Sequence, residues 1–105
     1  MTQTPRITQK FSVNVPISSE ELIRKKILIK NPYGIPRSFL ISTSRPDVVK
    51  ISEPLVNIPA MGSRSYDVFF GVITHKPMSL EALLFISNAE NNQQEEAYML
   101  QIKFV

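Results

Sequence analysis

The chain has 105 residues, of which 43% are hydrophobic and 20% charged, and this is the size and composition of one globular domain rather than a disordered segment. It contains no cysteine, so neither a disulfide nor a thiolate metal site is expected, and a reducing intracellular compartment is indicated. The net charge of +3 combines nine basic and three acidic residues in 1–52 with three basic and six acidic residues in 53–105. Two opposed patches of charge fit a protein-contacting module better than a nucleic-acid binder, which would be more uniformly basic.

Neither a targeting signal nor a membrane span is predicted. The first ten residues contain no apolar run of the kind that signal peptides carry. The longest uninterrupted apolar run, Ala82–Ile86, is far too short to cross a bilayer. We therefore expect a cytoplasmic chain with a single domain over residues 1–105, in which residues 1–8 form a loose N-terminal lead-in.

Short apolar segments follow one another along the chain between eight prolines. In chain order they are Phe11–Val15, Leu22–Lys30, Arg37–Thr43, Val48–Ile51, Leu55–Ile58, Arg64–Ile73, Leu80–Ser87 and Ala97–Val105. Several alternate apolar and polar residues, which is typical of half-buried strands, and no window has the period of a long amphipathic helix. The sequence therefore predicts an all-β fold, an antiparallel Ig-like β-sandwich of seven or eight strands. Because the Cys pair and core Trp of antibody domains are absent, the core must consist of aliphatic, Phe and Tyr side chains.

The stretch KNPYGIPRSFLIST, residues 30–43, is predicted to be a stiff connection between two strands. Pro32 pushes Asn31 out of the helical region, and an Asn side chain there can bond the backbone two residues on as an Asx turn. Gly34 is able to adopt positive φ, and Pro36 returns the chain to a strand. We expect Tyr33, at the tip of the turn, to pack on the end of the sandwich rather than to be offered to a partner.

These residues also carry a family resemblance. The segments KKILIKNPYGIPRSFLISTSRPDVVKI and VNIPAMGSRSYDVFF resemble the PapD/MSP/ASH superfamily of Ig-like domains. In that pattern a basic and apolar strand ends in Asn-Pro, and a Pro…Gly-Ser turn opens a strand whose aromatic residues enter the core. A narrower set of motifs resembles the C-terminal Ig-like repeats of the nephrocystin-4 family, which are scaffolds of the ciliary transition zone. That set is Lys25-Lys26-Ile27, Asn31-Pro32-Tyr33, Phe39, Ser44-Arg45-Pro46-Asp47, Asn91–Glu96 and Glu96-Ala97-Tyr98.

The resemblance covers about residues 20–105 and implies one module of a much longer protein. It implies a non-catalytic scaffold without a cofactor, located at the base of the cilium or flagellum. The implied partners are other transition-zone proteins and neighbouring Ig-like repeats of the same chain. The alternative is an MSP-type peptide-binding domain of a membrane- or cytoskeleton-associated protein. MSP domains that bind acidic peptides use lysines on the strands beside a groove, and the late segment Glu81–Ser87 has no lysine.

No residue pattern predicts an enzyme. His75 is the only histidine, so no triad or histidine metal cluster can form around it, and we expect it to be solvated. Glu95 and Glu96 are adjacent, and on a regular strand they would point to opposite faces rather than form an acid–base pair. The three glycines are too widely spaced to form a phosphate loop. Neither a metal nor a small-molecule substrate is expected.

Four basic residues are candidates for contact with a partner. If Ile27 and Ile29 face inward, Arg24, Lys26 and Lys30 face outward, and Arg37 on the next strand is expected to join them. This stripe is either an ordinary solvated face or a docking site for an acidic protein. Its positive charge would also allow a weak contact with a membrane surface. No aromatic residue interleaves with these charges in the sequence, so nucleic acid is not expected to bind.

Two apolar residues are candidates for a second contact surface. If Phe39 and Ile41 enter the core, Leu40 points outward, and the same alternation turns Met99 outward. Either Leu84 or the pair Leu83 and Phe85 would accompany them if the three strands share a sheet. Phe69 and Leu28 would then lie on the other sheet. These side chains are either scattered surface residues or a patch that packs on another repeat or a partner.

Overall fold

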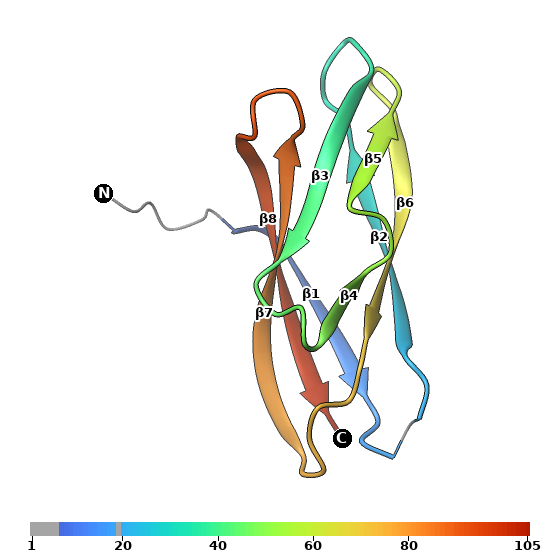
Figure 1. Ribbon diagram of the computed structural model, residues 1–105, viewed down its shortest axis with the longest axis vertical. Helices are drawn as coiled ribbons and strands as arrows, with labels where there is room; N and C mark the ends of the chain where they lie inside the picture. Colours follow the sequence, from blue (N-terminus) through green and yellow to red (C-terminus); the bar gives the residue numbers. More distant parts are fainter. Residues whose placement is uncertain (1–6, 19) are drawn as a thin grey trace, which may run out of the picture.

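The computed structural model describes residues 7–18 and 20–105, and it forms a β-sandwich of eight strands (Figure 1). The strands are β1 (Ile7–Val15), β2 (Ile23–Lys30), β3 (Arg37–Thr43), β4 (Val49–Ile51), β5 (Leu55–Ile58), β6 (Ser63–Phe70), β7 (Met78–Asn88) and β8 (Gln94–Phe104). Within these ranges of the chain there is no helix. The all-β prediction and the expected number of strands are confirmed, and every predicted segment corresponds to one strand.

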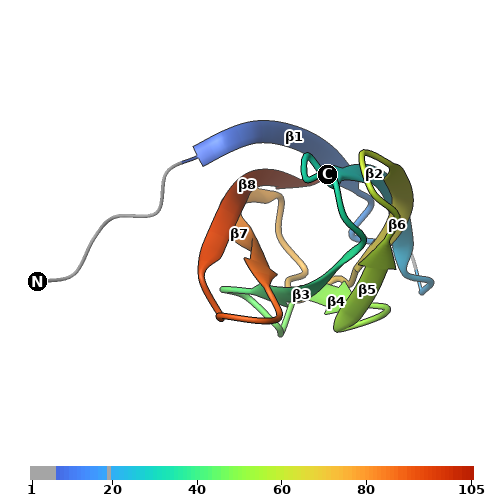
Figure 2. The same ribbon diagram turned by 90° about the horizontal axis from the view of Figure 1, so that it is seen from above.

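The strands form two sheets that face each other across the core (Figure 2). One has five strands in the order β1-β8-β7-β3-β5, and the other has three in the order β2-β6-β4. Every paired ladder is antiparallel except that of β1 with β8, which is parallel. The connection between β2 and β3 therefore carries the chain from one sheet to the other.

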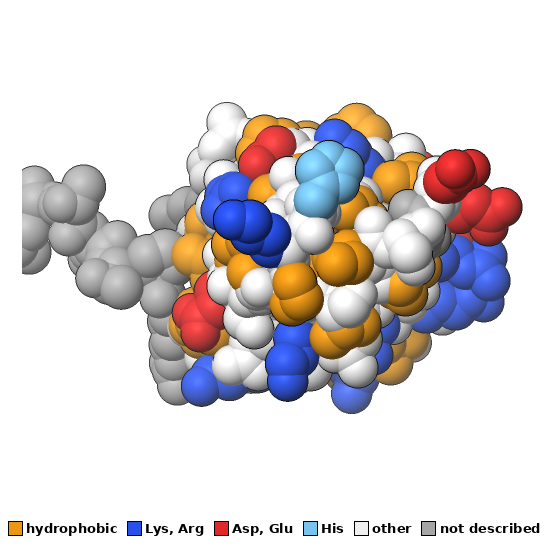
Figure 3. All heavy atoms as spheres, turned by 90° about the horizontal axis from the view of Figure 1, so that it is seen from below, with side chains coloured by type: hydrophobic (Ala, Val, Ile, Leu, Met, Phe, Trp, Pro, Cys, Tyr) orange, Lys and Arg blue, Asp and Glu red, His pale blue; other side chains and the backbone are white. Residues whose placement is uncertain are grey.

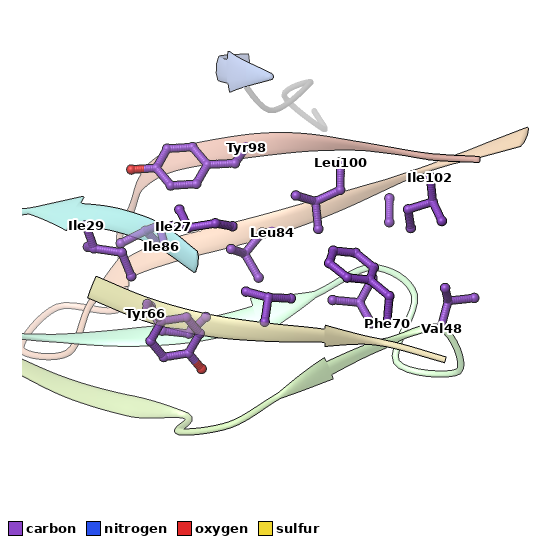
Figure 4. Packing of buried hydrophobic residues seen from close by; sticks show 14 of the residues in the cluster. Ile27, Ile29, Val48, Tyr66, Phe70, Leu84, Ile86, Tyr98, Leu100 and Ile102 are labelled. Carbon is purple, nitrogen blue, oxygen red and sulfur yellow. The ribbon is translucent and has the colours of Figure 1, made fainter. Parts of the chain in front are cut away.

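Alternation of buried and exposed residues in β2 and β3 shows how the core is built. In β2 the buried residues Ile27 and Ile29 are separated by exposed Leu28, and in β3 Phe39 and Ile41 are separated by exposed Leu40. The buried aromatic residues include Tyr66, Phe70 and Tyr98, which lie among aliphatic side chains of both sheets (Figure 4). Burying a large apolar side chain contributes about 1.5–3 kcal/mol, so this aliphatic and aromatic core supplies the gross driving force without a disulfide.

Asn31 organises the turn between β2 and β3. Its side chain is 2% exposed, and its Oδ1 accepts a hydrogen bond from the Tyr33 N–H at 3.0 Å, which confirms the predicted Asx turn. Its amide group donates to the carbonyls of Ile35, Ile58 and Pro59 at 2.9, 3.2 and 3.1 Å. The last two acceptors belong to the end of β5 and the turn that follows, so one amide joins two turns at the same end of the sandwich.

Gly34 does not adopt the positive φ that glycine allows. None of the glycines has positive φ, whereas Met61 does, with a φ of 56° in the turn between β5 and β6. The Met61 N–H donates to the Tyr33 carbonyl at 2.9 Å. The turn of residues 31–36 therefore obtains its shape from its two prolines and from Asn31 rather than from a left-handed glycine.

The predicted lead-in of residues 1–8 is described only at its end. Residues 7 and 8 already belong to β1, and the Thr8 hydroxyl donates to the Ala97 carbonyl at 3.4 Å. Residues 1–6 lie outside the described part of the chain. No helix among the described residues has the length and apolar character needed to cross a membrane.

Candidate interaction surfaces

The outer face of the three-stranded sheet carries basic side chains. Arg24, Lys26 and Lys30 are exposed on β2 while Ile27 and Ile29 are buried, so the predicted outward orientation of these residues is confirmed. Lys50 of β4 also belongs to this face, because Phe69 of β6 pairs with Arg24 on one side and with Lys50 on the other. We call Arg24, Lys26, Lys30 and Lys50 the basic face.

One expectation about the basic face is corrected by the pairing of the strands, and one member of the face was missed. One aromatic ring, the half-buried Phe69, does lie between two of its cations, because β6 is inserted between β2 and β4. Sequence order could not show this juxtaposition. Asp67 pairs with Lys26 and is the acidic residue of the same face. Lys50 was missed because the three-residue strand β4 is too short for its alternation to indicate a face.

Arg37 does not belong to the basic face, contrary to the prediction. It lies on β3 of the five-stranded sheet, and its Nη1 is 2.7 Å from Glu90 Oε2. Its guanidinium carbon lies 4.5 Å from the centroid of the Tyr33 ring. Because the chain changes sheets between β2 and β3, Lys30 before the turn and Arg37 after it belong to different sheets. Tyr33 is half-buried beneath Arg37, as expected for a residue packed on the end of the sandwich.

The outer face of the five-stranded sheet carries apolar side chains. Because β3, β7 and β8 are adjacent and Leu84 is buried, the pair that turns outward is Leu83 and Phe85. Leu40 is 36% exposed, and Met99 is partly exposed opposite Leu83. Sequence reasoning missed a further member, Leu55 of the edge strand β5, which is 49% exposed and pairs directly with Leu40.

These residues form a continuous strip across the sheet. Leu40 pairs with Ser87, which places it diagonally beside Phe85, two residues away on β7. Diagonal neighbours of this kind are about 7–8 Å apart, within reach of an aromatic side chain. We call Leu40, Leu55, Leu83, Phe85 and Met99 the apolar face. It lies on the opposite outer surface of the sandwich from Leu28 and Phe69, as predicted.

A pocket of about 380 Å³ opens at the end of the sandwich that carries the β2–β3 turn. Its lining residues are Lys30, Pro32, Tyr33, Phe39, Ile86, Glu95 and Glu96. The presence of both glutamates corrects the expectation that they point to opposite faces. Glu96 pairs with Ile86 and Gln94 with Ser87, so Glu95 is an extra residue, a β-bulge that interrupts the alternation.

The two carboxylates of this pocket have different partners. The Tyr33 hydroxyl donates to Glu95 Oε1, and the Tyr98 hydroxyl donates to Glu96 Oε2 at 2.6 Å. Burial raises the pKa of the Glu95 carboxyl, and the adjacent charge of Glu96 raises it further. Burial also raises the pKa of the Tyr98 hydroxyl, with Glu96 adding to the effect. Glu95 Oε2 is buried and has no hydrogen-bond partner among the described residues.

The end of the molecule that carries the C-terminus is a second apolar surface, which sequence reasoning missed. Figure 3 shows it end-on, with hydrophobic side chains around the single histidine. Leu22, Ile73, Met78 and Val105 are between 42% and 52% exposed there. They come from the connections around β2 and β7 and from the residue after β8, so no single segment shows the pattern. His75 is exposed, as predicted, and the described residues contain no group of three or more His, Cys, Asp or Glu side chains able to hold a metal.

Comparison with known proteins assigns the chain to a family. The family model described as NPH4 Ig-like domain 4 matches residues 8–105. Nephrocystin-4 of Xenopus laevis is 21% identical over 100 residues, a match that covers 95% of this chain and 7% of that protein. The chain therefore spans only a small part of the length of this relative.

Solved structures with low sequence identity share the fold. WR4, an MSP family member of C. elegans, has a TM-score of 0.60 and 10% identity, over 90% of this chain and 92% of that one. The CupB2 chaperone of Pseudomonas aeruginosa has a TM-score of 0.66 and 13% identity, over 92% of this chain and 53% of that one. The Ig-like sandwich of the MSP and PapD type is thus common to all three chains. The match of the family model over residues 8–105 shows that the chain belongs to the family of the fourth Ig-like domain of nephrocystin-4.

Proposed function

We propose that this domain is a non-catalytic protein-interaction module of a nephrocystin-4-like scaffold at the ciliary transition zone and basal body, where it contributes to cilium assembly and gating. Support comes from the family match over residues 8–105 and from the nephrocystin-4 relative. The proposed location is the cytoplasmic base of the cilium or flagellum. The proposed partners are other transition-zone proteins and neighbouring Ig-like repeats of the same chain.

The apolar face is the observation that carries this proposal. It combines Leu40, Leu55, Leu83, Phe85 and Met99 across four adjacent strands of one sheet. The inner side of the same sheet packs into the core, and the five residues of the apolar face are not part of that core. A continuous apolar strip that the fold leaves in water is a typical site for protein contact.

A second candidate function is favoured by the basic face. Arg24, Lys26, Lys30 and Lys50 surround one aromatic ring and one carboxylate, which is an arrangement suited to an acidic segment with an apolar side chain. This would be an MSP-type peptide-binding domain, in keeping with the MSP fold of the chain. The same face would support a weak contact with an anionic membrane surface.

The two candidates are separated by co-purification with ciliary transition-zone proteins from ciliated cells, using the longer protein that contains this domain. We expect Leu40→Asp combined with Met99→Asp to reduce recovery of partners about tenfold or more, because two carboxylates would be desolvated in an apolar contact. Leu28→Asp is the matched control, since Leu28 is an exposed strand leucine on the opposite outer surface.

Circular dichroism of the isolated variants must show an intact fold, because both altered side chains lie outside the core. An unfolded double variant would contradict the placement of Leu40 and Met99. Loss of partners on Lys26→Glu or Lys30→Glu, with full recovery for the double variant, would instead support the peptide-binding candidate. An acidic, phenylalanine-containing peptide whose binding weakens in the same two lysine variants would point the same way.

A further inference from the structure

We propose that the apolar face packs against the Ig-like repeat that precedes this domain in the longer protein. The inference rests on the proposed function, because it concerns the same face, and it names one occupant for that face. The family is described as that of the fourth Ig-like domain, so earlier Ig-like domains come before this one in a member of the family. The question is therefore which surface lies nearest to the chain where it arrives from those domains.

The chain enters the sandwich beside the apolar face. Ile7, the first described residue, pairs with Ala97 of β8, and Ala97 pairs with Phe85 of β7. Two strand spacings of about 4.8 Å place the backbone of Ile7 about 10 Å from that of Phe85. From Gln9 to Val15, β1 pairs with β8 residue by residue, so the entry point is held in place relative to the face. Figures 1 and 2 show the start of β1 alongside β8.

The other half of the same outer surface is polar. Its exposed outward positions on β7 and β8 are Ser79, Glu81, Gln101 and Lys103. Because Gln101 is the next outward residue after Met99, the surface changes from apolar to polar within one period of the strand. The apolar side chains therefore gather in the half of the sheet at which the chain enters.

A segment that followed Val105 would start from a different surface. Val105 lies about 20 Å beyond Met99 along the direction of β8, at about 3.4 Å per residue. It belongs to the end of the molecule seen in Figure 3, where Leu22, Ile73 and Met78 are its exposed apolar neighbours. The apolar face is thus placed for a neighbour on the N-terminal side.

The size of the apolar face favours a tethered neighbour. Its residues cross four strands and the length of three outward positions, so it measures roughly 15 Å by 13 Å, or about 200 Å². Stable complexes between separate chains bury about 800 Å² on each partner. A short covalent connection instead supplies an effective concentration in the millimolar range, at which a small apolar contact remains closed. A partner from a separate chain would have to contact much surface beyond this face.

The test is the reactivity of single cysteines, introduced into a domain that has none, towards a maleimide. Leu40→Cys reports on the apolar face, and Leu28→Cys is the matched control on the opposite outer surface. Because the core lies entirely within this chain, each variant can be labelled alone and again in the purified longer protein, with peptide mapping to locate the label.

We expect positions 40 and 28 to react at similar rates in the isolated chain. In the longer protein position 40 should react about tenfold or more slowly, because it is labelled only while the contact is open, and position 28 should be unaffected. Deletion of the preceding repeat should restore fast labelling at position 40. Met99→Asp should restore it as well, whereas Ser79→Asp, on the polar half of the surface, should leave it slow.

The inference is overturned if position 40 reacts equally fast in both proteins, if deletion of the preceding repeat or Met99→Asp leaves it slow, or if Ser79→Asp restores it. No transition-zone protein is present in this experiment, so its failure is distinct from that of the proposed function. Equal rates would leave the face free for a partner from another chain, which the co-purification tests. Slow labelling together with full recovery of partners by the Leu40→Asp, Met99→Asp variant would support the contact between repeats and contradict docking of other proteins on this face.

Discussion

At the scale of single residues, Asn31 shows how one side chain can fix two turns. Its Oδ1 closes the local Asx turn at Tyr33, which the sequence predicted because an Asn before a Pro favours that geometry. Its amide group meets three carbonyl oxygens, two of which lie 27 and 28 residues further along the chain. Those partners could not be predicted, since they depend on how β5 docks beside β3.

We predict that Asn31→Ala lowers the free energy of unfolding by about 2–3 kcal/mol, because buried carbonyls lose their donor. Asn31→Asp should be more destabilising at neutral pH, since it directs a carboxylate at those carbonyls. The fold would then raise the pKa of the new carboxyl above its unfolded value, so the deficit should shrink as the pH falls. Urea unfolding at neutral and acidic pH measures both effects.

The matched control is Asn14→Asp, which changes an exposed residue of β1 in the same way. It should leave stability almost unchanged at both pH values. If the Asn31→Asp chain were as stable as this control at neutral pH, the side-chain nitrogen of Asn31 could not be the group that faces the three carbonyls.

At the scale of elements, the turn between β5 and β6 is packed more tightly than the turn between β2 and β3. A Cβ added at Gly62 would lie 2.8 Å from Pro59 Cγ and 3.1 Å from the Pro59 carbonyl oxygen, and a proline ring has little freedom to move. A Cβ added at Gly34 would meet nothing within 4 Å. The Gly62 carbonyl also accepts the Asn31 N–H at 2.9 Å, so a shift there would disturb both turns.

We predict that Gly62→Ala lowers the free energy of unfolding by about 1–3 kcal/mol, as overpacking does in other tight sites. Gly34→Ala should be neutral or stabilising by up to about 1 kcal/mol, because it only reduces the freedom of the unfolded chain. Chemical denaturation of the two variants in parallel provides the comparison. If Gly34→Ala were as destabilising as Gly62→Ala, Gly34 would need a backbone conformation that alanine cannot adopt, contrary to the structure.

The regular strands could be predicted from the sequence, whereas the β-bulge of β8 could not. Alternation in β2 and β3 identified which residues face the core, because a half-buried strand has a period of two. The bulge at Glu95 breaks that period, and nothing in the local run of polar residues indicates where the extra residue lies. Reasoning from regular alternation therefore separated Glu95 from Glu96, whereas the structure brings both carboxylates to one pocket.

At the scale of the whole molecule, strand order decides which candidate residues act together. Leu40 and Met99 are joined by Phe85 and Leu83 because β3, β7 and β8 are neighbours, as the sequence analysis supposed. Arg37 is separated from Lys30 because the chain crosses between sheets in the turn that joins them. Residues within one strand could thus be assigned a face from the sequence, but the members contributed by short or distant strands could not.

The two sheets consequently present different outer surfaces. The apolar face occupies the five-stranded sheet, and the basic face occupies the three-stranded sheet. A scaffold module with unlike surfaces can contact two partners at once, for example a neighbouring repeat and another protein. Which surface meets the partner is the central question for the proposed function.

Site-specific photo-crosslinking in ciliated cells answers that question most directly. A photoreactive amino acid would replace Leu40 on the apolar face or Leu28 on the opposite surface, in the longer protein that contains this domain. We predict that position 40 forms crosslinks to transition-zone proteins or to a neighbouring Ig-like repeat, whereas position 28 forms few. Crosslinks from position 28 with none from position 40 would contradict the assignment of the apolar face as the docking surface.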